Sequence, residues 1–327
     1  MKLSHFKLPW LKYRLGKDSD KQFAVLSTLH WFRSLSIVLD DYHNKSIITQ
    51  FYNEVNPRKS CDSHDNLVFS NLLLSLHHHA SLDNLSSSSY NKIDICRLAI
   101  IACYYSVYFS SRAMIAAKSG SDPKNHSDNT RDWQHDIVND QLIPYPFNLS
   151  ITNLVKKEAE AQLNVFKQDL NNYKLIKLPC NVNDARAQLV HYLSGTVNWK
   201  IKSIEEKIKK DEKLENFRTK NSQVCRDQLL AKKRVNFLDQ MYCMRVKANY
   251  RDSLYLSYNL VASEETMSIF VSDLLFVSNS FLECALSYSR KRVVKAIWSK
   301  FVNDIIYHSS FSIDSDIIQK FQAPSTK

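Results

Sequence analysis

The stretch "YYSVYFSSRAMIAAKSGSDPKNHSD", from Tyr104 to Asp128, decides the fold class. It continues an apolar segment, Ile95 to Ala117, that only two arginines and a few small polar residues interrupt. Gly120 and Pro123 follow it, as expected where a helix ends. The pattern predicts a helix from Ile93 to Lys118, and its arginines favour burial inside protein over a membrane span.

Glycine is scarce in the chain, which has 327 residues but only 3 glycines and 7 prolines. A sheet-rich protein needs glycine in its turns, so this scarcity predicts long helices joined by polar loops. The 7 cysteines form no Cys-x-x-Cys pair and no zinc-ligand spacing. We therefore expect reduced thiols, a cytoplasmic protein and no metal or cofactor. The N-terminus carries no apolar run of secretory length, which agrees with that location.

Apolar residues at helical spacing predict further helices on both sides of this segment. Ser150 and Asp184 are the expected N-caps of two of them. A serine-rich stretch near residue 85 is typical of a linker, and "YKLIKLP", residues 173–179, is the one strand candidate. The expected helices are 22–40, 47–52, 66–78, 128–140, 150–172, a long one from 184 with the stripe Leu189, Leu193, Val197, Ile201, Ile204 and Ile208, then 226–250 and 263–301. The fold class predicted is all-α.

Two parts of the chain resemble the HEPN superfamily. The quoted stretch is similar to the second helix and following turn of that family, which tend to show a Tyr-Tyr pair, another aromatic residue, Arg-Ala, and then Gly, Pro-Lys and His. The matching residues here are Tyr104, Tyr105, Tyr108, Arg112, Ala113, Gly120, Pro123, Lys124 and His126. "MRVKANYRD" (244–252) resembles the Arg-x-x-Ala-Asp-Tyr stretch of a later helix, with Asn249 in place of aspartate. "SEETMSIFVSDLLFVSNSFLECAL" (263–286) resembles the last helix of the same branch.

The resemblance implies an up-down helical bundle at residues 85–290, in which the two matched parts are neighbours. Residues 141–229 would then be a helical insertion. Residues 1–84 would form an N-terminal helical region, and residues 291–327 a C-terminal helical extension and tail. It also implies a homodimer or a complex with a partner, because HEPN proteins pair their motif helices across two protomers.

One signature of HEPN ribonucleases is an arginine followed, after four to six residues, by a histidine, and Arg186 and His191 have this spacing. Histidine suits proton transfer near neutral pH, and arginine suits the charge that develops on phosphate. On a helix the two residues lie about 140° apart, so they flank a face rather than share it. Catalysis and ordinary surface or capping roles are both open for them.

Three other groups of histidines are weaker candidates. Arg58 and His64 also match the spacing but lie in a polar loop, and two matches are no more than chance gives. Arg131 and His135 are one residue too close and suit a solvated helix face. The consecutive histidines 77–79 cannot aim three imidazoles at one metal from a helix. His126 is expected to pack or cap its turn, and Tyr104, Tyr105, Tyr108 and Phe109 are expected in the core.

Positive charge is concentrated between residues 200 and 252, with 15 Lys/Arg against 8 Asp/Glu in a chain of net charge +11. Such a segment suits a polyanion, whereas i,i+4 ion pairs on a solvated face explain its first part, 200–213, equally well. Arg245, Lys247 and Arg251 could contact phosphates while the Tyr250 ring stacks on a base. Alternatively, Arg245 and Tyr250 hold the helix packing. The candidate nucleic-acid contacts are Arg218, Arg226, Lys232, Lys233, Arg234, Arg245, Lys247 and Arg251.

We therefore expect a HEPN-like toxin of a toxin–antitoxin or abortive-infection system that cleaves RNA without metal. RNA would be its substrate or ligand. An antitoxin, another defence protein or a ribonucleoprotein would be its partner, with no membrane involved. Two alternatives remain: a non-catalytic helical module that binds nucleic acid or protein within a defence complex, and a purely structural helical scaffold.

Overall fold

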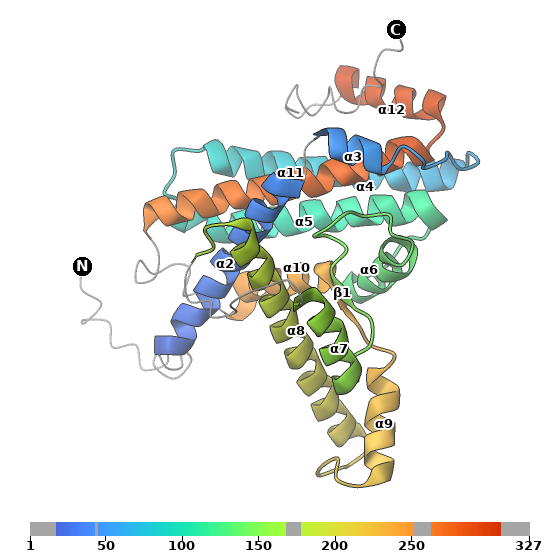
Figure 1. Cartoon of the computed structure of the whole chain (residues 1–327). Helices are drawn as coiled ribbons and strands as arrows, with labels where there is room; N and C mark the ends of the chain where they lie inside the picture. The colour runs from blue at the N-terminus through green and yellow to red at the C-terminus, as the bar shows by residue number, and fades with distance from the viewer. Residues whose placement is uncertain (1–17, 43–44, 168–177, 252–262, 309–327) are drawn as a thin grey trace.

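The computed structural model describes residues 18–42, 45–167, 178–251 and 263–308, which are mostly helical (Figure 1). The all-α prediction is confirmed. The elements in chain order are α2 (Asp18–Tyr42), α3 (Lys45–Phe51), α4 (Asp62–Ser87), α5 (Lys92–Ser119), α6 (His126–Trp133), the π-turn η2 (Gln134–Val138), β1 (Ser150–Ile151), α7 (Lys156–Lys167), α8 (Val182–Asp211), α9 (Lys220–Leu230), β2 (Val235–Asn236), α10 (Phe237–Val246), the π-turn η3 (Lys247–Arg251), α11 (Glu264–Arg292) and α12 (Lys295–His308).

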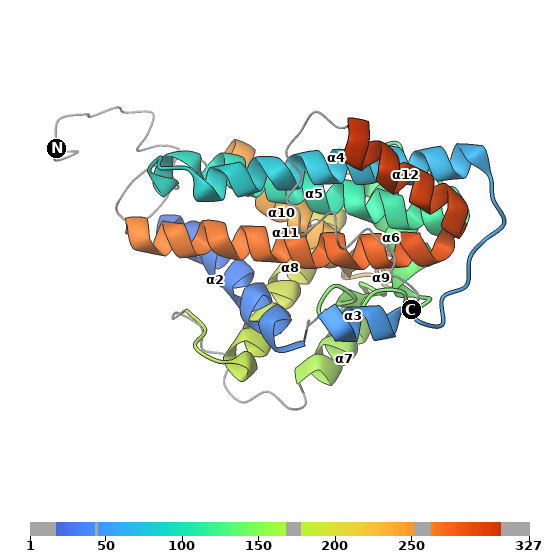
Figure 2. The same cartoon turned by 90° about the horizontal axis from the view of Figure 1, so that it is seen from above.

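Three long helices, α4, α5 and α11, lie side by side and hold the main core (Figures 1 and 2). The N-terminus of α5 contacts that of α11 through a bond from the Lys92 amide to Glu264, 2.7 Å. At the other end, Arg292 Nε donates to the carbonyl of Ala117, 3.3 Å. Helices α5 and α11 are therefore parallel, and α4 is antiparallel to α5. Helices α5 and α11 are long and apolar enough to cross a membrane, but 67% of the most apolar part of each is buried within the protein.

Helix α5 begins and ends close to the predicted positions. Its C-cap is Gly120, whose φ of 73° is left-handed, and the Gly120 amide donates to the Ala116 carbonyl, 2.9 Å. Glycine adopts this conformation without the steric cost that a Cβ brings. The turn after it carries the chain into α6.

The serine-rich stretch near residue 85 is not a linker up to Ser87, because α4 continues through it. Leu82 is fully buried there. The Lys92 ammonium donates to the carbonyls of Leu85, Ser86 and Ser88, at 3.1, 2.8 and 2.6 Å, and so satisfies the open end of α4. The connection to α5 is correspondingly short, and α4 shares the main core with α5.

Buried serines and one histidine join the three long helices. Ser75 Oγ lies 2.7 Å from Ser110 Oγ and donates to the Ser106 carbonyl at 2.8 Å. Ser278 Oγ donates to Ser106 Oγ at 2.9 Å and lies 2.9 Å from His79 Nδ1. These groups are almost fully buried and all are hydrogen-bonded, so the network favours one register of α4, α5 and α11 over others.

A second, smaller core lies among α7, α8, α9 and the two strands. Helix α8 serves both cores. Its first turns pack on α2, where Ser34 Oγ donates to Gln188 at 3.1 Å, while Val190, Val197 and Ile201 face the second core. Figure 1 shows α7, the far half of α8 and α9 extending away from the long bundle. The predicted apolar stripe of α8 is buried except for Ile204, which is half-buried.

Several predicted boundaries were wrong in detail. Ser150 is in β1, paired with Asn236, and α7 begins only at Lys156. Asn181, three residues before Asp184, is the N-cap of α8. The helix expected over 226–250 is divided by β2, and that over 263–301 ends at Arg292 before α12 begins. Of the strand candidate, residues 173–177 lie outside the described residues.

Candidate functional site

Arg186 and His191 lie on α8 but have different neighbours. The Arg186 guanidinium hydrogen-bonds the Tyr145 hydroxyl, where burial raises the tyrosine pKa and Arg186 opposes that rise. The His191 side chain is exposed, and its ring meets Tyr192 edge-on with centroids 5.6 Å apart. Surrounding protein and then the charge of Lys167 lower the pKa of His191. No contact joins Arg186 to His191 within the described part of the chain.

The structure instead brings His126 and Arg245 into one aromatic cluster. His126 Nδ1 lies 2.6 Å from the Tyr104 hydroxyl. Its ring centroid lies 4.8 Å from that of Tyr108 and 5.1 Å from that of Tyr242. The Arg245 guanidinium carbon lies 5.5 Å from the Tyr104 ring centroid and 5.7 Å from the Tyr242 centroid. We call these five residues, from α5, α6 and α10, the histidine–arginine cluster.

The charges in this cluster suit proton transfer next to a fixed cation. Burial, and then the positive charge of Arg245, lower the pKa of His126. Burial also raises the pKa of Tyr104, so its hydroxyl keeps its proton. Because Tyr104 occupies Nδ1, Nε2 is the imidazole nitrogen left for a ligand. Such an imidazole is neutral at pH 7 and can exchange a proton with a bound group.

Arg245 has no ion pair and no hydrogen bond among the residues that the structure describes. Its Nε is buried without an acceptor there. Three tyrosine rings surround the guanidinium, the third being Tyr105 at 5.6 Å. Cation–π contact with these rings partly replaces water around the charge, but none of them accepts its N–H bonds in the plane of the guanidinium. The cation is therefore available to an anion.

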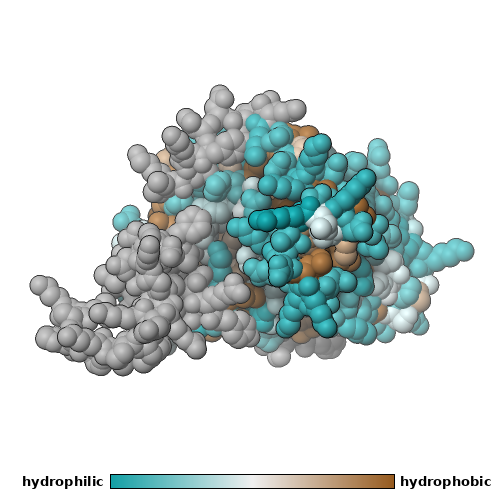
Figure 3. Space-filling view, turned by 90° about the horizontal axis from the view of Figure 1, so that it is seen from below, coloured by the Kyte–Doolittle hydropathy of each residue, from teal (hydrophilic) through white to brown (hydrophobic). Residues whose placement is uncertain are grey.

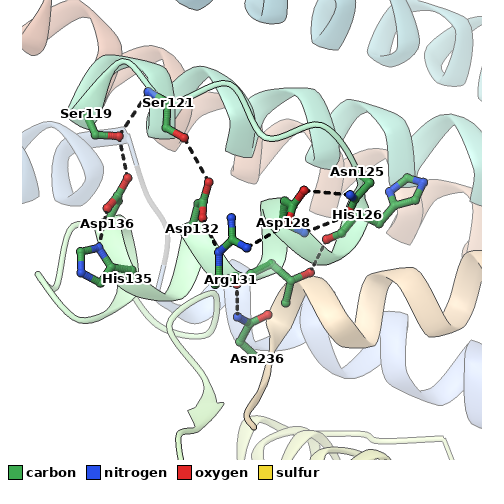
Figure 4. Close-up of polar contacts among 11 residues, drawn as sticks. Ser119, Ser121, Asn125, His126, Asp128, Arg131, Asp132, His135, Asp136 and Asn236 are labelled. Carbon is green, nitrogen blue, oxygen red and sulfur yellow. Dashed lines mark hydrogen bonds and ion pairs between the residues drawn. The ribbon is translucent and has the colours of Figure 1, made fainter. Parts of the chain in front are cut away.

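Polar contacts hold α6 and η2 against the end of α5 and so position the turn that carries His126 (Figure 4). Ser119 at the end of α5 donates to Asp136 at 2.6 Å, and Ser121 donates to Asp132 at 3.1 Å. Asn125 caps α6 by accepting from the Asp128 amide at 3.0 Å. In Figure 4 the His126 ring lies at the N-terminal end of α6, away from Asp132 and Asp136.

A second set of contacts places α10 against α6. Asn236 Nδ2 donates to the Thr130 carbonyl at 3.1 Å, as Figure 4 shows. Asn236 also begins α10 with a capping box: its side chain accepts from the Asp239 amide, and the Asp239 carboxylate accepts from the backbone amide of Asn236. The same asparagine therefore starts the helix that carries Tyr242 and Arg245 and ties it to the helix that carries His126.

The weaker histidine candidates have other surroundings. Arg131 pairs with Asp128 and Asp132, each at 2.9 Å, and the exposed His135 pairs with Asp136 at 2.7 Å. Arg58 pairs with Asp65 at 2.6 Å. Of the three consecutive histidines, His79 is buried against Ser278, whereas His78 stacks on rings of α5. Among the described residues, no three of His, Cys, Asp or Glu are grouped to hold a metal ion.

The candidate nucleic-acid contacts are spread over three places. Arg218 is exposed on the α9 side, whereas Arg226 pairs with Asp227 at 2.8 Å. Lys232 and Lys233 are exposed before β2, and burial lowers the pKa of Arg234 beside them. Lys247 donates to Ser27 at 3.1 Å near Arg245, and the side chain of Arg251 lies outside the described residues. In the described part of the face seen from below, the residues are mainly hydrophilic with scattered hydrophobic ones (Figure 3).

The sequence singles out His126 and Tyr104 for packing roles and Arg245 as a candidate nucleic-acid contact or packing residue, and it does not single out Tyr242. The pairing of His126 with Arg245 spans 119 positions, which no local spacing rule detects. The one available signal was that both residues fall in the two stretches that resemble neighbouring helices. Comparison of the chain with family models, curated proteins and solved structures gives no match in any of the three.

Proposed function

We propose that this protein binds RNA and cleaves it without a metal, and that the histidine–arginine cluster is the site. One observation carries the proposal: the same aromatic cluster holds a neutral histidine and an arginine that, among the described residues, have no partner at Nε2 and no carboxylate, respectively. Proton transfer and phosphate stabilisation are the two tasks of such a cleavage. Arg186 and His191, which lack a mutual contact, support it less well.

The reaction needs few groups. In the tautomer whose Nδ1–H donates to the Tyr104 oxygen, His126 Nε2 has a lone pair and takes the proton of a ribose 2′-hydroxyl, and the 2′-oxygen attacks the adjacent phosphorus. The bond from phosphorus to the 5′-oxygen breaks, and that oxygen takes a proton from solvent. Arg245 stabilises the extra negative charge on the phosphate oxygens during the transfer. The products are a 2′,3′-cyclic phosphate and a free 5′-hydroxyl.

The setting we propose is a HEPN-like toxin of a toxin–antitoxin or abortive-infection system, held in check by a partner protein. The order and adjacency of α5, α10 and α11 support it, because the stretches that resemble the family lie on these helices. In this setting the basic residues before β2 would hold RNA outside the cleavage site.

Mapping RNA 5′ ends after brief expression tests the cleavage. We expect new ends with the natural protein, and none with His126→Ala or Arg245→Gln. His135→Ala is the matched control, since this exposed histidine lies on the turn that follows α6, and it should cut normally. His191→Ala and Arg186→Ala should cut normally too. New ends from His126→Ala, or their loss in His191→Ala alone, would contradict the site.

A non-catalytic RNA-binding module is the second candidate. The partial burial of His126 and the occupation of its Nδ1 by Tyr104 favour it, because a packing role also explains them. Toxicity with salt-dependent RNA binding but without new RNA ends would select this candidate.

A further inference from the structure

A row of planar side chains leads from the histidine–arginine cluster along the surface of α5. Arg245 lies against Tyr105, with 5.6 Å from guanidinium carbon to ring centroid. The Tyr105 and Phe109 centroids are 6.1 Å apart, and His78 from α4 packs beside both rings, 5.2 Å from Tyr105 and 5.6 Å from Phe109. Arg112 lies 5.9 Å from the Phe109 centroid at the far end. We call these five residues the ring column.

The ring column is accessible and carries positive charge only at its ends. All five side chains are partly exposed. Burial, and then the neighbouring His77, lower the pKa of His78, so the imidazole beside Tyr105 and Phe109 is neutral at pH 7. The column thus has three aromatic rings, two on α5 and one on α4, between two guanidinium groups.

The surroundings have more cations than carboxylates. Arg112 pairs with Asp122, and Lys124, whose side chain is 79% exposed, shares the same carboxylate. Arg245 has no carboxylate within the described residues. Among the described residues, Asp122 is therefore the one carboxylate that forms an ion pair with any of these three cations. An anionic ligand would supply the missing charge, and a ligand with flat groups would use the rings.

We propose that a single-stranded segment of RNA lies along the ring column, with bases stacked against its exposed rings and phosphates at Arg245 and Arg112. This proposal rests on the proposed function and names its substrate as unpaired RNA. Aromatic side chains interleaved with cations bind single strands because every base has a stacking face. A duplex keeps its bases stacked inside, so it cannot use the rings.

The length of the column sets how much RNA it holds. Tyr105 and Arg112 are seven positions apart on one helix, which is about 10 Å along its axis. Stacked bases are separated by roughly 3.4 Å, so about three nucleotides fit. A strand placed in this way would enter the histidine–arginine cluster at Arg245, which belongs to both groups.

The test measures binding of a fluorescent, fully 2′-O-methylated oligonucleotide, which cannot be cleaved, by anisotropy. The natural protein should bind the single strand at least tenfold more tightly than the matching duplex. Phe109→Leu, which keeps an apolar side chain, should raise Kd roughly five- to 150-fold. Phe109→Tyr keeps the aromatic ring and should bind the single strand with the Kd of the natural protein. Tyr90→Leu, at a side chain 72% exposed beyond α4, is the control and should leave Kd unchanged.

The outcomes separate this proposal from the proposed function. If the natural protein binds no RNA, both fail. If it binds the single strand but Phe109→Leu and Tyr105→Leu bind equally well, only the ring column is overturned. Equal affinity for strand and duplex also overturns it. Both leucine variants should keep the melting temperature within a few degrees of that of the natural protein. If only one of them does, the Kd of that folded variant decides the test.

Discussion

His126 shows how one residue acquires a chemical role from its neighbours. Its pKa is lowered because protein covers the ring and because Arg245 adds a like charge. The Tyr104 hydroxyl at 2.6 Å then fixes which nitrogen faces a ligand. Neither neighbour is close in sequence to the other, so the role proposed for His126 depends on the fold.

Removing the charge of Arg245 should raise the pKa of His126. In Arg245→Gln the like charge is gone while burial remains, so the imidazolium is less disfavoured. In the natural protein the cleavage rate should fall as pH drops through the lowered pKa, because protonated His126 cannot take a proton. NMR titration of the His126 ring measures the pKa directly, and a pKa that is lower in Arg245→Gln would contradict the electrostatic argument.

The glycines offer a matched pair of substitutions. Gly120 has φ +73°, and a Cβ there would lie 2.3 Å from the His64 ring, whereas around the helical Gly195 no atom lies within 4 Å of the added Cβ. Gly120→Ala should destabilise the protein by about 1–2 kcal/mol. Gly195→Ala should stabilise it by about 0.5–1 kcal/mol. Urea unfolding measures both, and the same sign for the two would show that backbone conformation does not decide these sites.

At the scale of residues, the sequence predicts the local role of a residue better than it predicts which distant residue it contacts. Gly120 was identified as a helix stop from its place after an apolar run, and the structure confirms it. His126 and Arg245 were each singled out, but their meeting depends on how α6 and α10 are tied through Asn236. A single asparagine hydrogen bond of this kind leaves no pattern in the sequence.

Helix α4 is the element whose end the sequence misplaced. Serines have poor helix propensity, so a run of them near residue 85 is typical of a linker. The helix persists because Leu82 is buried and the Lys92 ammonium binds the last carbonyls. Tertiary packing here outweighs local preference.

Replacing Lys92 by methionine tests this account of the α4 end. The change keeps an apolar stem but leaves three carbonyls without the ammonium, and should cost about 2 kcal/mol. Hydrogen exchange should quicken at residues 82–87 before the rest of α4. Unchanged exchange there, with unchanged stability, would mean that the serine-rich turn is held by packing alone.

How well the other elements could be predicted depends on the strength of their apolar periodicity in the sequence. Among the long helices with continuous apolar stripes, α5 was predicted within one residue at each end, and the starts of α8 and α11 within two. The end of α11 was predicted nine residues too late. The division of the 226–250 helix was missed because β2 exists only through pairing with β1, about eighty-five residues earlier. A two-residue strand has no periodicity to detect.

At the scale of the whole molecule, the all-α class follows from composition, whereas the arrangement of the bundle does not. The adjacency of α5 and α11 was expected from the resemblance, and they do pack side by side. The second core around α8 was not foreseen, since its stripe alone does not say which side chains face which core. The division into residues 1–84, 85–290 and 291–327 stays a prediction.

The central claim is that the histidine–arginine cluster cuts RNA. Purified protein, incubated with a single-stranded RNA in the presence of EDTA, should yield fragments that end in 2′,3′-cyclic phosphate, identified by mass spectrometry. His126→Ala, with an unchanged melting temperature, should yield none, and His135→Ala should yield the normal amount. Identical fragments from folded His126→Ala would show that this cluster does not perform the cleavage.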